Sequence, residues 1–84
     1  MKNKVLINLI VPELMETYEI YIPVNERIAK IKQLLINSLK DLSDNKLDET
    51  KKYNLMDPDT GVVYDNKMIV RDLKIRNSKK IILY

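Results

Sequence analysis

The side chains able to do chemistry in this 84-residue chain are carboxylates, amines, hydroxyls and phenols, because the sequence contains no cysteine and no histidine. Their absence excludes a cysteine nucleophile, a serine–histidine pair, and thiolate or imidazole ligands for zinc or iron. The single glycine, Gly61, cannot build a phosphate-binding loop, since such loops need several glycines for close approach of the backbone. Catalysis by Asp, Glu, Lys or Tyr remains open, but no other feature of the sequence argues for it. We therefore expect a protein that is not an enzyme and that holds no cofactor.

Three aspartates lie close together in the second half of the chain, at Asp57, Asp59 and Asp65. They suggest a calcium loop, but the ligand spacing of such loops, which ends in a glutamate, is absent. Residues 57–61 (DPDTG) instead form a strong turn signal, because proline fits the second turn position and Gly61 accepts a positive φ. The sequence thus predicts a turn here and no metal site.

The positive charge of the chain, +3 in total, is concentrated near its C-terminal end, where residues 69–84 carry five basic groups against one acidic group. Such a segment can contact phosphates, yet it lacks the interleaved aromatic residues on which single-stranded bases stack. Nucleic-acid binding through this segment is therefore the alternative hypothesis, and it predicts an affinity that falls steeply with salt. The basic helix residues Arg27, Lys30 and Lys40 are interpreted as a solvated face.

Apolar periodicity predicts two strands followed by a helix. Residues 4–11 (KVLINLIV) and 17–24 (TYEIYIPV) alternate with the period of a strand, and their spacing favours a hairpin. The period then changes to that of an amphipathic helix, with Asn25 as its N-cap and its end near Leu42. The predicted apolar stripe of this helix contains Ile28, Ile31, Leu34, Leu35, Leu39 and Leu42.

The rest of the chain predicts shorter elements. A polar loop follows the helix, then short strands at 53–56 and 62–64, with Tyr53 and Tyr64 packing at the edge of the core. Ile69 and Leu73 anchor a short irregular or helical segment. Asn77 and Ser78 predict a turn in which Asn77 takes the left-handed conformation, and a last strand covers residues 80–84.

One helix can cover only one face of a sheet, so the fold class expected is two-layered α+β, with a ββαββ mixed sheet. The helix side chains would pack against apolar side chains of the strands. Full burial of each such side chain would stabilise the fold by about 1.5–3 kcal/mol. The strand residues expected in this core are Val5, Ile7, Leu9, Ile20, Ile22, Leu55, Ile81 and Leu83.

Two stretches resemble a known family. Residues 20–24 (IYIPV), followed by Ile28 and Ile31, resemble the strand-to-helix entry of ubiquitin-like domains. Residues 70–83 (VRDLKIRNSKKIIL) are similar to that family's terminal L-x-D-x-x-I-x-x-G-D-x-L-x-L pattern, with Asn77 where glycine is usual. The resemblance spans nearly the whole chain and implies a single β-grasp, or ubiquitin-like, domain over residues 1–84.

Within that group the chain looks most like the YukD/EsaB proteins, accessory cytoplasmic components of bacterial type VII (WXG100) secretion systems. The resemblance implies a cytoplasmic module with a protein partner, which we expect to be a membrane-embedded secretion component. The sequence has no apolar run long enough for membrane insertion, and we expect a monomer or a weak homodimer. It ends at Leu83 and Tyr84 without the Gly-Gly tail of ubiquitin and the sulfur carriers, so conjugation is not expected.

The expected binding surface is the sheet face that points away from the helix. If the odd positions of the first strand face the helix, its even positions face outward, as do alternate residues of the other strands. Apolar side chains rich in Tyr and Met, with a basic rim, are typical of protein-binding surfaces. The predicted protein-binding set is Leu6, Asn8, Ile10, Tyr21, Met56, Ile82 and Tyr84, and the predicted basic rim is Lys4, Arg71 and Lys80.

Overall fold

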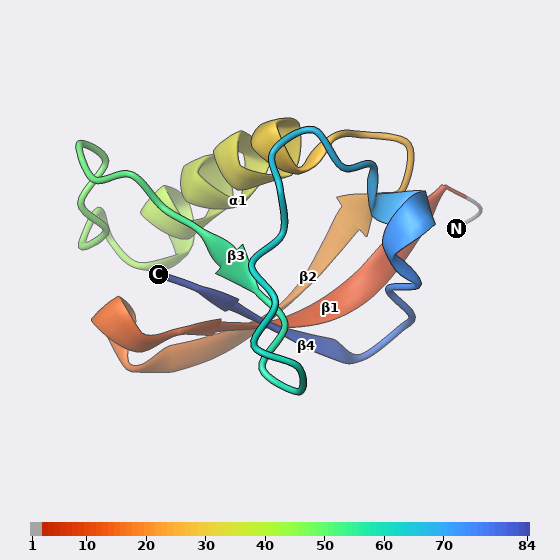
Figure 1. The fold of residues 1–84 in the computed structure, drawn as a ribbon. Helices are drawn as coiled ribbons and strands as arrows, with labels where there is room; N and C mark the ends of the chain where they lie inside the picture. Colours follow the sequence, from red (N-terminus) through yellow and green to blue (C-terminus); the bar gives the residue numbers. More distant parts are fainter. Residues whose placement is uncertain (1–2) are drawn as a thin grey trace.

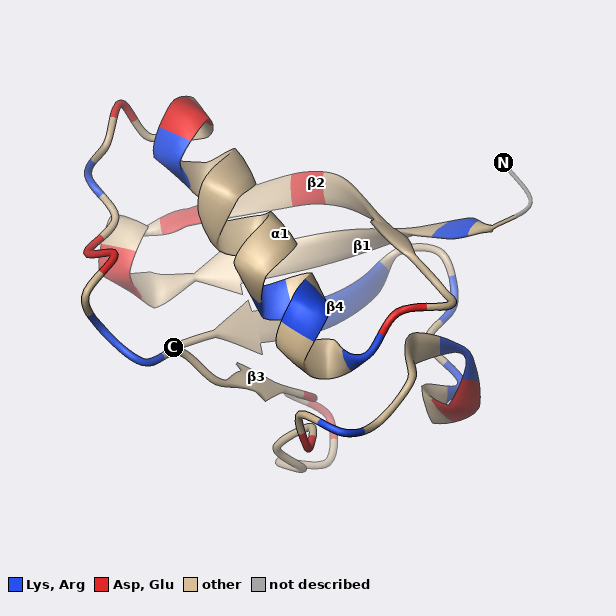
Figure 2. Cartoon of the chain, turned by 90° about the horizontal axis from the view of Figure 1, so that it is seen from above, with Lys and Arg blue, Asp and Glu red and all other residues tan. Residues whose placement is uncertain are grey.

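The computed structural model describes residues 3–84 and places one helix across one face of a four-stranded sheet (Figure 1; seen from above in Figure 2). The alternating residues form β1 (Lys4–Val11), which pairs antiparallel with β2 (Glu16–Pro23) and parallel with β4 (Lys79–Leu83). A short strand, β3 (Leu55–Met56), pairs antiparallel with β4 and completes the order β2-β1-β4-β3. The predicted α+β architecture, a mixed sheet with one helix on one face, is confirmed.

The short elements differ from their predicted bounds. The strand expected at 53–56 is reduced to β3, and no strand forms at 62–64, where Val63 makes a single bridge to Met56. The reason is the tight turn between them, which brings only one pair of residues into register before the chain leaves the sheet. Two 3-10 helices complete the described structure, η1 (Pro12–Leu14) in the hairpin and η2 (Val70–Leu73) before β4.

The core lies between the odd positions of β1 and the apolar stripe of α1 (Ile28–Leu42). Every predicted strand residue of the core is buried except Ile20, which is only partly buried because β2 is an edge strand. On α1, by contrast, Leu34 and Leu42 stay exposed. The core also contains residues that the sequence did not assign to it: Val11, Leu47 and Val70.

The start of α1 differs from the prediction. Its N-cap is Arg27, without a side-chain cap, whereas Asn25 lies outside the helix. The first two backbone N–H groups of the helix donate instead to the carbonyl oxygens of Met68 (2.8 Å) and Asn66 (3.1 Å). A loop distant in sequence therefore satisfies N–H groups that a capping side chain would otherwise bind.

The turn before β4 also differs from the prediction. Ser78, not Asn77, takes the left-handed conformation, with φ of 70°. Asn77 instead uses its side chain, since its Oδ1 accepts a hydrogen bond of 3.0 Å from the backbone N–H of Leu6. Counted over residues 70–83, the glycine of the ubiquitin-like pattern falls on Ser78 rather than on Asn77, so the residue with the left-handed conformation occupies the glycine position, and Asn77 holds the start of β4 against β1.

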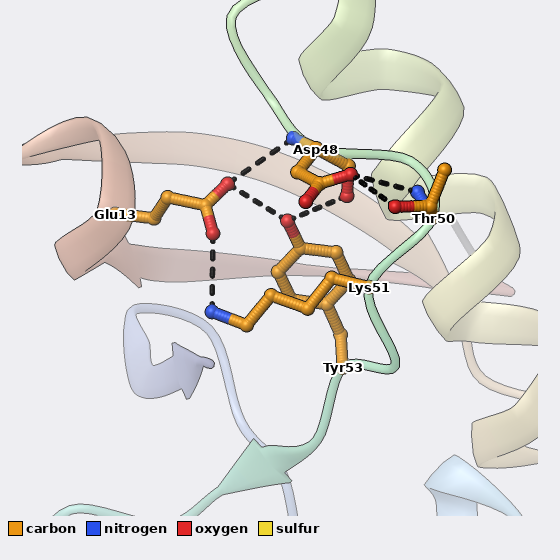
Figure 3. A network of polar contacts seen from close by, with 5 residues as sticks. All are labelled: Glu13, Asp48, Thr50, Lys51 and Tyr53. Atoms are coloured by element: carbon orange, nitrogen blue, oxygen red, sulfur yellow. Dashed lines mark hydrogen bonds and ion pairs between the residues drawn. The ribbon is translucent and has the colours of Figure 1, made fainter.

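A polar network fastens the long loop after α1 to the hairpin (Figure 3). The Tyr53 hydroxyl has one proton to donate and lies within hydrogen-bond distance of two acceptors, Glu13 Oε2 (2.8 Å) and the carbonyl oxygen of Asp48 (2.9 Å). Glu13 also accepts from the backbone N–H of Asp48 (3.2 Å) and from Lys51 Nζ (3.1 Å). One carboxylate from η1 therefore binds three groups of the loop.

This network shifts the pKa values of its two central groups. The hydrogen bond from Tyr53, followed by that from the Asp48 backbone, lowers the pKa of Glu13 below its ordinary value of 4.5. Burial, followed by the hydrogen bond to Glu13, raises the pKa of Tyr53 well above its ordinary value. The folded state therefore favours an ionised Glu13 beside a neutral Tyr53.

Two leucines of α1 provide a direct test of the core. We expect Leu39→Ala, at a fully buried position, to lower the free energy of unfolding by about 2–5 kcal/mol, because it removes packed methyl groups and leaves a cavity. Leu42→Ala is the matched control, since this side chain is 58% exposed and its loss is expected to cost less than about 0.5 kcal/mol. Urea denaturation measures both, and equal losses would contradict the packing described here.

The network predicts a pH dependence of stability. Because the pKa of Glu13 is lowered on folding, its contribution is present above pH 4.5 and is lost as the pH falls through the lowered value. We therefore expect Glu13→Gln to destabilise the protein near neutral pH and to make little difference in strong acid. Urea unfolding across this pH range measures the effect, with the exposed Glu26→Gln as control. A Glu13→Gln effect that is the same at all pH values would contradict the proposed role of the charge.

Candidate protein-binding surface

The face of the sheet opposite α1, which we call the open face, carries the even residues of β1. Leu6, Asn8 and Ile10 point to it, because Val5, Ile7, Leu9 and Val11 are buried against the helix. Strand pairing places the side chains of neighbouring strands in rows across this face. The three β1 residues are each half-buried by these neighbours.

The largest apolar group on the open face spans three strands and the chain beyond β3. Ile10 pairs with Ile82, Ile82 pairs with Met56, and Met56 bridges to Val63. Tyr84 follows two residues after Ile82, and its backbone is held by two hydrogen bonds with Asn54 (2.6 and 3.0 Å). We call these residues the Met56 patch: Ile10, Met56, Val63, Ile82 and Tyr84.

The exposure of the Met56 patch is greatest at its outer members. Val63 is 45% exposed and Tyr84 is 39% exposed, whereas Ile10, Met56 and Ile82 are half-buried. Val63 was not among the residues that the sequence assigned to this surface. The short apolar run at 62–64, returning antiparallel to Met56 across the predicted turn, is the signal that would have found it.

The predicted set does not form one continuous apolar surface. Leu6 pairs with Tyr21, which is 52% exposed, at one end of the open face. Between this pair and the Met56 patch runs a polar row, in which Asn8 pairs with Glu19 on one side and with Lys80 on the other. The Asn8 side chain donates to the carbonyl oxygen of Ser78 (3.4 Å), so it is part of the sheet's own hydrogen bonding.

The predicted basic rim is also distributed differently. Lys80 lies at the middle of the open face rather than at its rim, because β1 and β4 are the two central strands. Lys4 is exposed at the start of β1. Arg71 lies in η2 and donates from its guanidinium to Asn25 Oδ1 (3.2 Å), beside the chain that leads into α1.

A tight turn holds Val63 against Met56. Asp57 accepts from the backbone N–H of Asp59 (2.9 Å), its carbonyl oxygen accepts from Gly61 (2.8 Å), and Gly61 has a φ of 74°. Lys79 Nζ then bridges Asp57 (2.8 Å) and Asp59 (2.9 Å). The Lys79 hydrogen bond lowers the pKa of Asp57, and the bond to Asp57 raises the pKa of Lys79.

This ion pair reduces the positive charge that the C-terminal basic segment can offer to a phosphate. Lys79 is occupied by two aspartates, so it does not add to a phosphate-binding surface. The other Lys and Arg residues of the part of the chain that the structure describes are spread over β1, α1, η2, β4 and the loops (Figure 2). Within residues 3–84, no cluster of three or more His, Cys, Asp or Glu side chains suited to a metal ion is found, and no helix is long and apolar enough to cross a bilayer.

Comparisons with known proteins identify the fold. No protein-family model matches the chain, and no curated protein matches it in sequence. Among solved structures, it resembles the ubiquitin-like domain of an Arabidopsis thaliana protein with a TM-score of 0.71 and 13% identity, over 98% of this chain and 77% of that one. The fold is therefore ubiquitin-like, as the resemblance in sequence implied.

Two further structures come from type VII secretion. The ubiquitin-like domain of the Mycobacterium tuberculosis type VII secretion system protein ECCD1 has a TM-score of 0.74 and 8% identity, over 95% of this chain and 96% of that one. A chain of the MycP5-free ESX-5 inner membrane complex has a TM-score of 0.82 and 10% identity, over 98% of this chain. The match covers only 21% of that longer chain.

The turn beside the Met56 patch generates a prediction. We expect Asp57→Ala to increase hydrogen exchange at the Tyr64 amide, which donates to the Leu55 carbonyl (2.8 Å), by about tenfold, because the turn loses its acceptor and its ion pair. Asp59→Asn is the matched control, since it removes only the more exposed partner of Lys79. Amide exchange followed by NMR measures both, and an unchanged Tyr64 amide in Asp57→Ala would contradict this account of the turn.

Proposed function

We propose that this chain is a non-catalytic protein-interaction module of a bacterial type VII secretion system, of the YukD/EsaB kind, and that residues 1–84 form its single domain. The ubiquitin-like fold supports the proposal, because the same fold occurs in ECCD1 and in the ESX-5 inner membrane complex. The absence of cysteine and histidine from the sequence is in keeping with a binding role. In this proposal the protein acts in the cytoplasm, on a membrane-embedded component of the apparatus.

The observation that carries the proposal is the Met56 patch. It places apolar side chains from β1, β3 and β4 on the face that α1 leaves uncovered (Figure 1). Burial of apolar area against a partner contributes about 25 cal/mol per Å², and the aromatic ring of Tyr84 adds a large contact area. The polar row of Glu19, Asn8 and Lys80 beside the patch would then form part of the polar rim typical of interfaces.

Site-specific crosslinking tests this surface without relying on a destabilising core substitution. A photoreactive amino acid at Val63, in the full chain expressed in its host, is expected to crosslink to a membrane or ATPase component of the secretion system. Val62 is the matched control, because it is the preceding residue and is similarly exposed at 51%, against 45% for Val63. In an extended segment neighbouring side chains point to opposite sides, so position 62 is expected to give little of the same product.

The outcomes separate the proposal from its alternatives. Mass spectrometry that identifies a secretion component at position 63 and not at position 62 would support it. Equal crosslinking at both positions, or only partners unrelated to secretion, would contradict it. Crosslinks to nucleic acid, with binding that falls steeply as salt rises, would favour the basic-segment hypothesis instead.

A further inference from the structure

The two edges of the sheet differ in length and in cover. At one edge β3 is only two residues long, and the chain beyond it folds back so that Val63 bridges to Met56. At the other edge β2 is eight residues long and pairs only with β1 (Figure 2). An uncovered edge strand of this length offers a row of unpaired backbone N–H and C=O groups to another strand.

The register with β1 shows which residues of β2 turn these groups outward. The N–H of Val24 donates to the carbonyl oxygen of Asn3 (2.9 Å), so position 24 points toward β1. Inward and outward positions alternate along an antiparallel strand, so the even positions of β2 point inward. The outward positions are Thr17, Glu19, Tyr21 and Pro23. No loop of the described chain binds their backbone groups, and proline is tolerated there because an outward position needs no N–H for the ladder with β1.

A mainly apolar groove of about 230 Å³ lies beside the end of this edge, between residues 20–23 of β2 and α1. Leu34 of α1 lines the groove and is 36% exposed, and Ile20 on the opposite wall is half-buried. Both side chains therefore keep apolar surface that the core does not cover. A strand added to the edge of β2 would cover this surface and so gain more than its backbone hydrogen bonds.

We propose that the strand added here is β2 of a second copy of this chain, paired antiparallel about a two-fold axis at Ile20. In this register Glu19 of each copy lies opposite Tyr21 of the other, and the two pairs exchange four backbone hydrogen bonds. Thr17 donates a further bond to the carbonyl oxygen of Pro23 at each end. The N–H that proline lacks is therefore missing only at the ends of the new ladder.

Charge and hydrogen bonding together favour this register. An axis at Glu19 would give as many hydrogen bonds, but it would place two carboxylates directly opposite each other, which is destabilising. An axis nearer either end of β2 would leave fewer of its outward residues paired. With the axis at Ile20 no like charges are opposite, and the edge is complementary to itself, as a two-fold dimer requires. The side chains that meet on the helix side are then apolar or aromatic: Tyr18, Ile20 and Ile22.

Such a dimer is one continuous sheet with both helices on one side and both open faces on the other. The Met56 patch lies on β1, β3, β4 and the chain beyond β3, away from β2, so pairing leaves the patch of each copy uncovered. The dimer would present two such patches in the same direction. Its formation does not depend on the function proposed for the patch.

Association at increasing concentration tests the proposal. The hydrogen bonds and the small apolar contact are offset by the cost of association, so we expect a dissociation constant of about 0.1–1 mM. NMR of the full chain across this range is expected to show saturable shifts and slowed hydrogen exchange at the amides of Thr17, Glu19 and Tyr21, and sedimentation equilibrium is expected to give a dimer. A chain that stays monomeric, that grows beyond a dimer, or that gains this protection only from another protein would overturn the proposal.

Two exposed side chains of the open face test which residues are opposite. Tyr21→Glu places a carboxylate opposite Glu19 of the other copy, twice in the dimer, and is expected to raise the dissociation constant about tenfold. Adding Glu19→Lys turns both repulsive pairs into pairs of opposite charge and is expected to restore the affinity. Val62→Glu is the matched control, because Val62 is 51% exposed against 52% for Tyr21 but lies near the other edge of the sheet. A double variant that binds no better than Tyr21→Glu, or an equal loss in the control, would overturn the pairing.

An isotope-filtered NOE experiment on a mixture of labelled and unlabelled protein locates the axis. Opposite residues of a non-hydrogen-bonded antiparallel pair bring their Cα atoms to about 4.5 Å, and only the residue on the axis meets its own counterpart. We therefore expect a contact between the α-protons of Ile20 in the two copies. Contacts centred on another residue, or none at a concentration where dimers are populated, would overturn the proposed axis.

Discussion

The parallel pairing of β1 with β4 is the interaction on which the rest of the structure depends. It joins the two ends of the chain at the centre of the sheet, with Ile7 to Ile10 paired to Lys79 to Ile82. Parallel strands need a long connection, and here the chain between β1 and β4 contains η1, β2, α1, β3 and η2. Once this pairing forms, the odd residues of β1 and Ile81 and Leu83 of β4 face the same helix, and the open face is defined by the residues between them.

The long connection is held by contacts made between segments distant in sequence. The loop at 66–68 binds the first N–H groups of α1, and Glu13 fastens the loop after α1 to the hairpin. Asn66 and Glu13 lie in segments that the sequence marks as turns, but local sequence rules do not show which distant segment each turn contacts. Both satisfy polar groups that a small domain would otherwise leave partly desolvated and unpaired.

The two faces of the molecule differ in chemistry because they are covered differently. The open face has no helix and combines an apolar group with a polar row, the composition of a surface that another protein can cover. The helix side is filled by the core except where the hairpin extends beyond the end of α1. The charged side chains there are mainly carboxylates, those of Glu13, Glu16 and Asp44.

The sequence by itself determined the two long strands of the hairpin, the helix, the last strand, their order, the α+β fold and most of the core, because each depends on a local period of apolar residues, whereas the strand predicted at 62–64 does not form. The alternation in β1 also correctly predicted which of its side chains face away from the helix. It could not show that Val63 joins Met56, that Lys80 stands between two apolar groups, or that Asn77 binds Leu6 through its side chain. These facts depend on register between segments far apart in the chain, and local periodicity carries no information about register. The cleft between the end of α1 and the hairpin also could not be predicted from the sequence, because it depends on the relative lengths and placement of the hairpin and the helix.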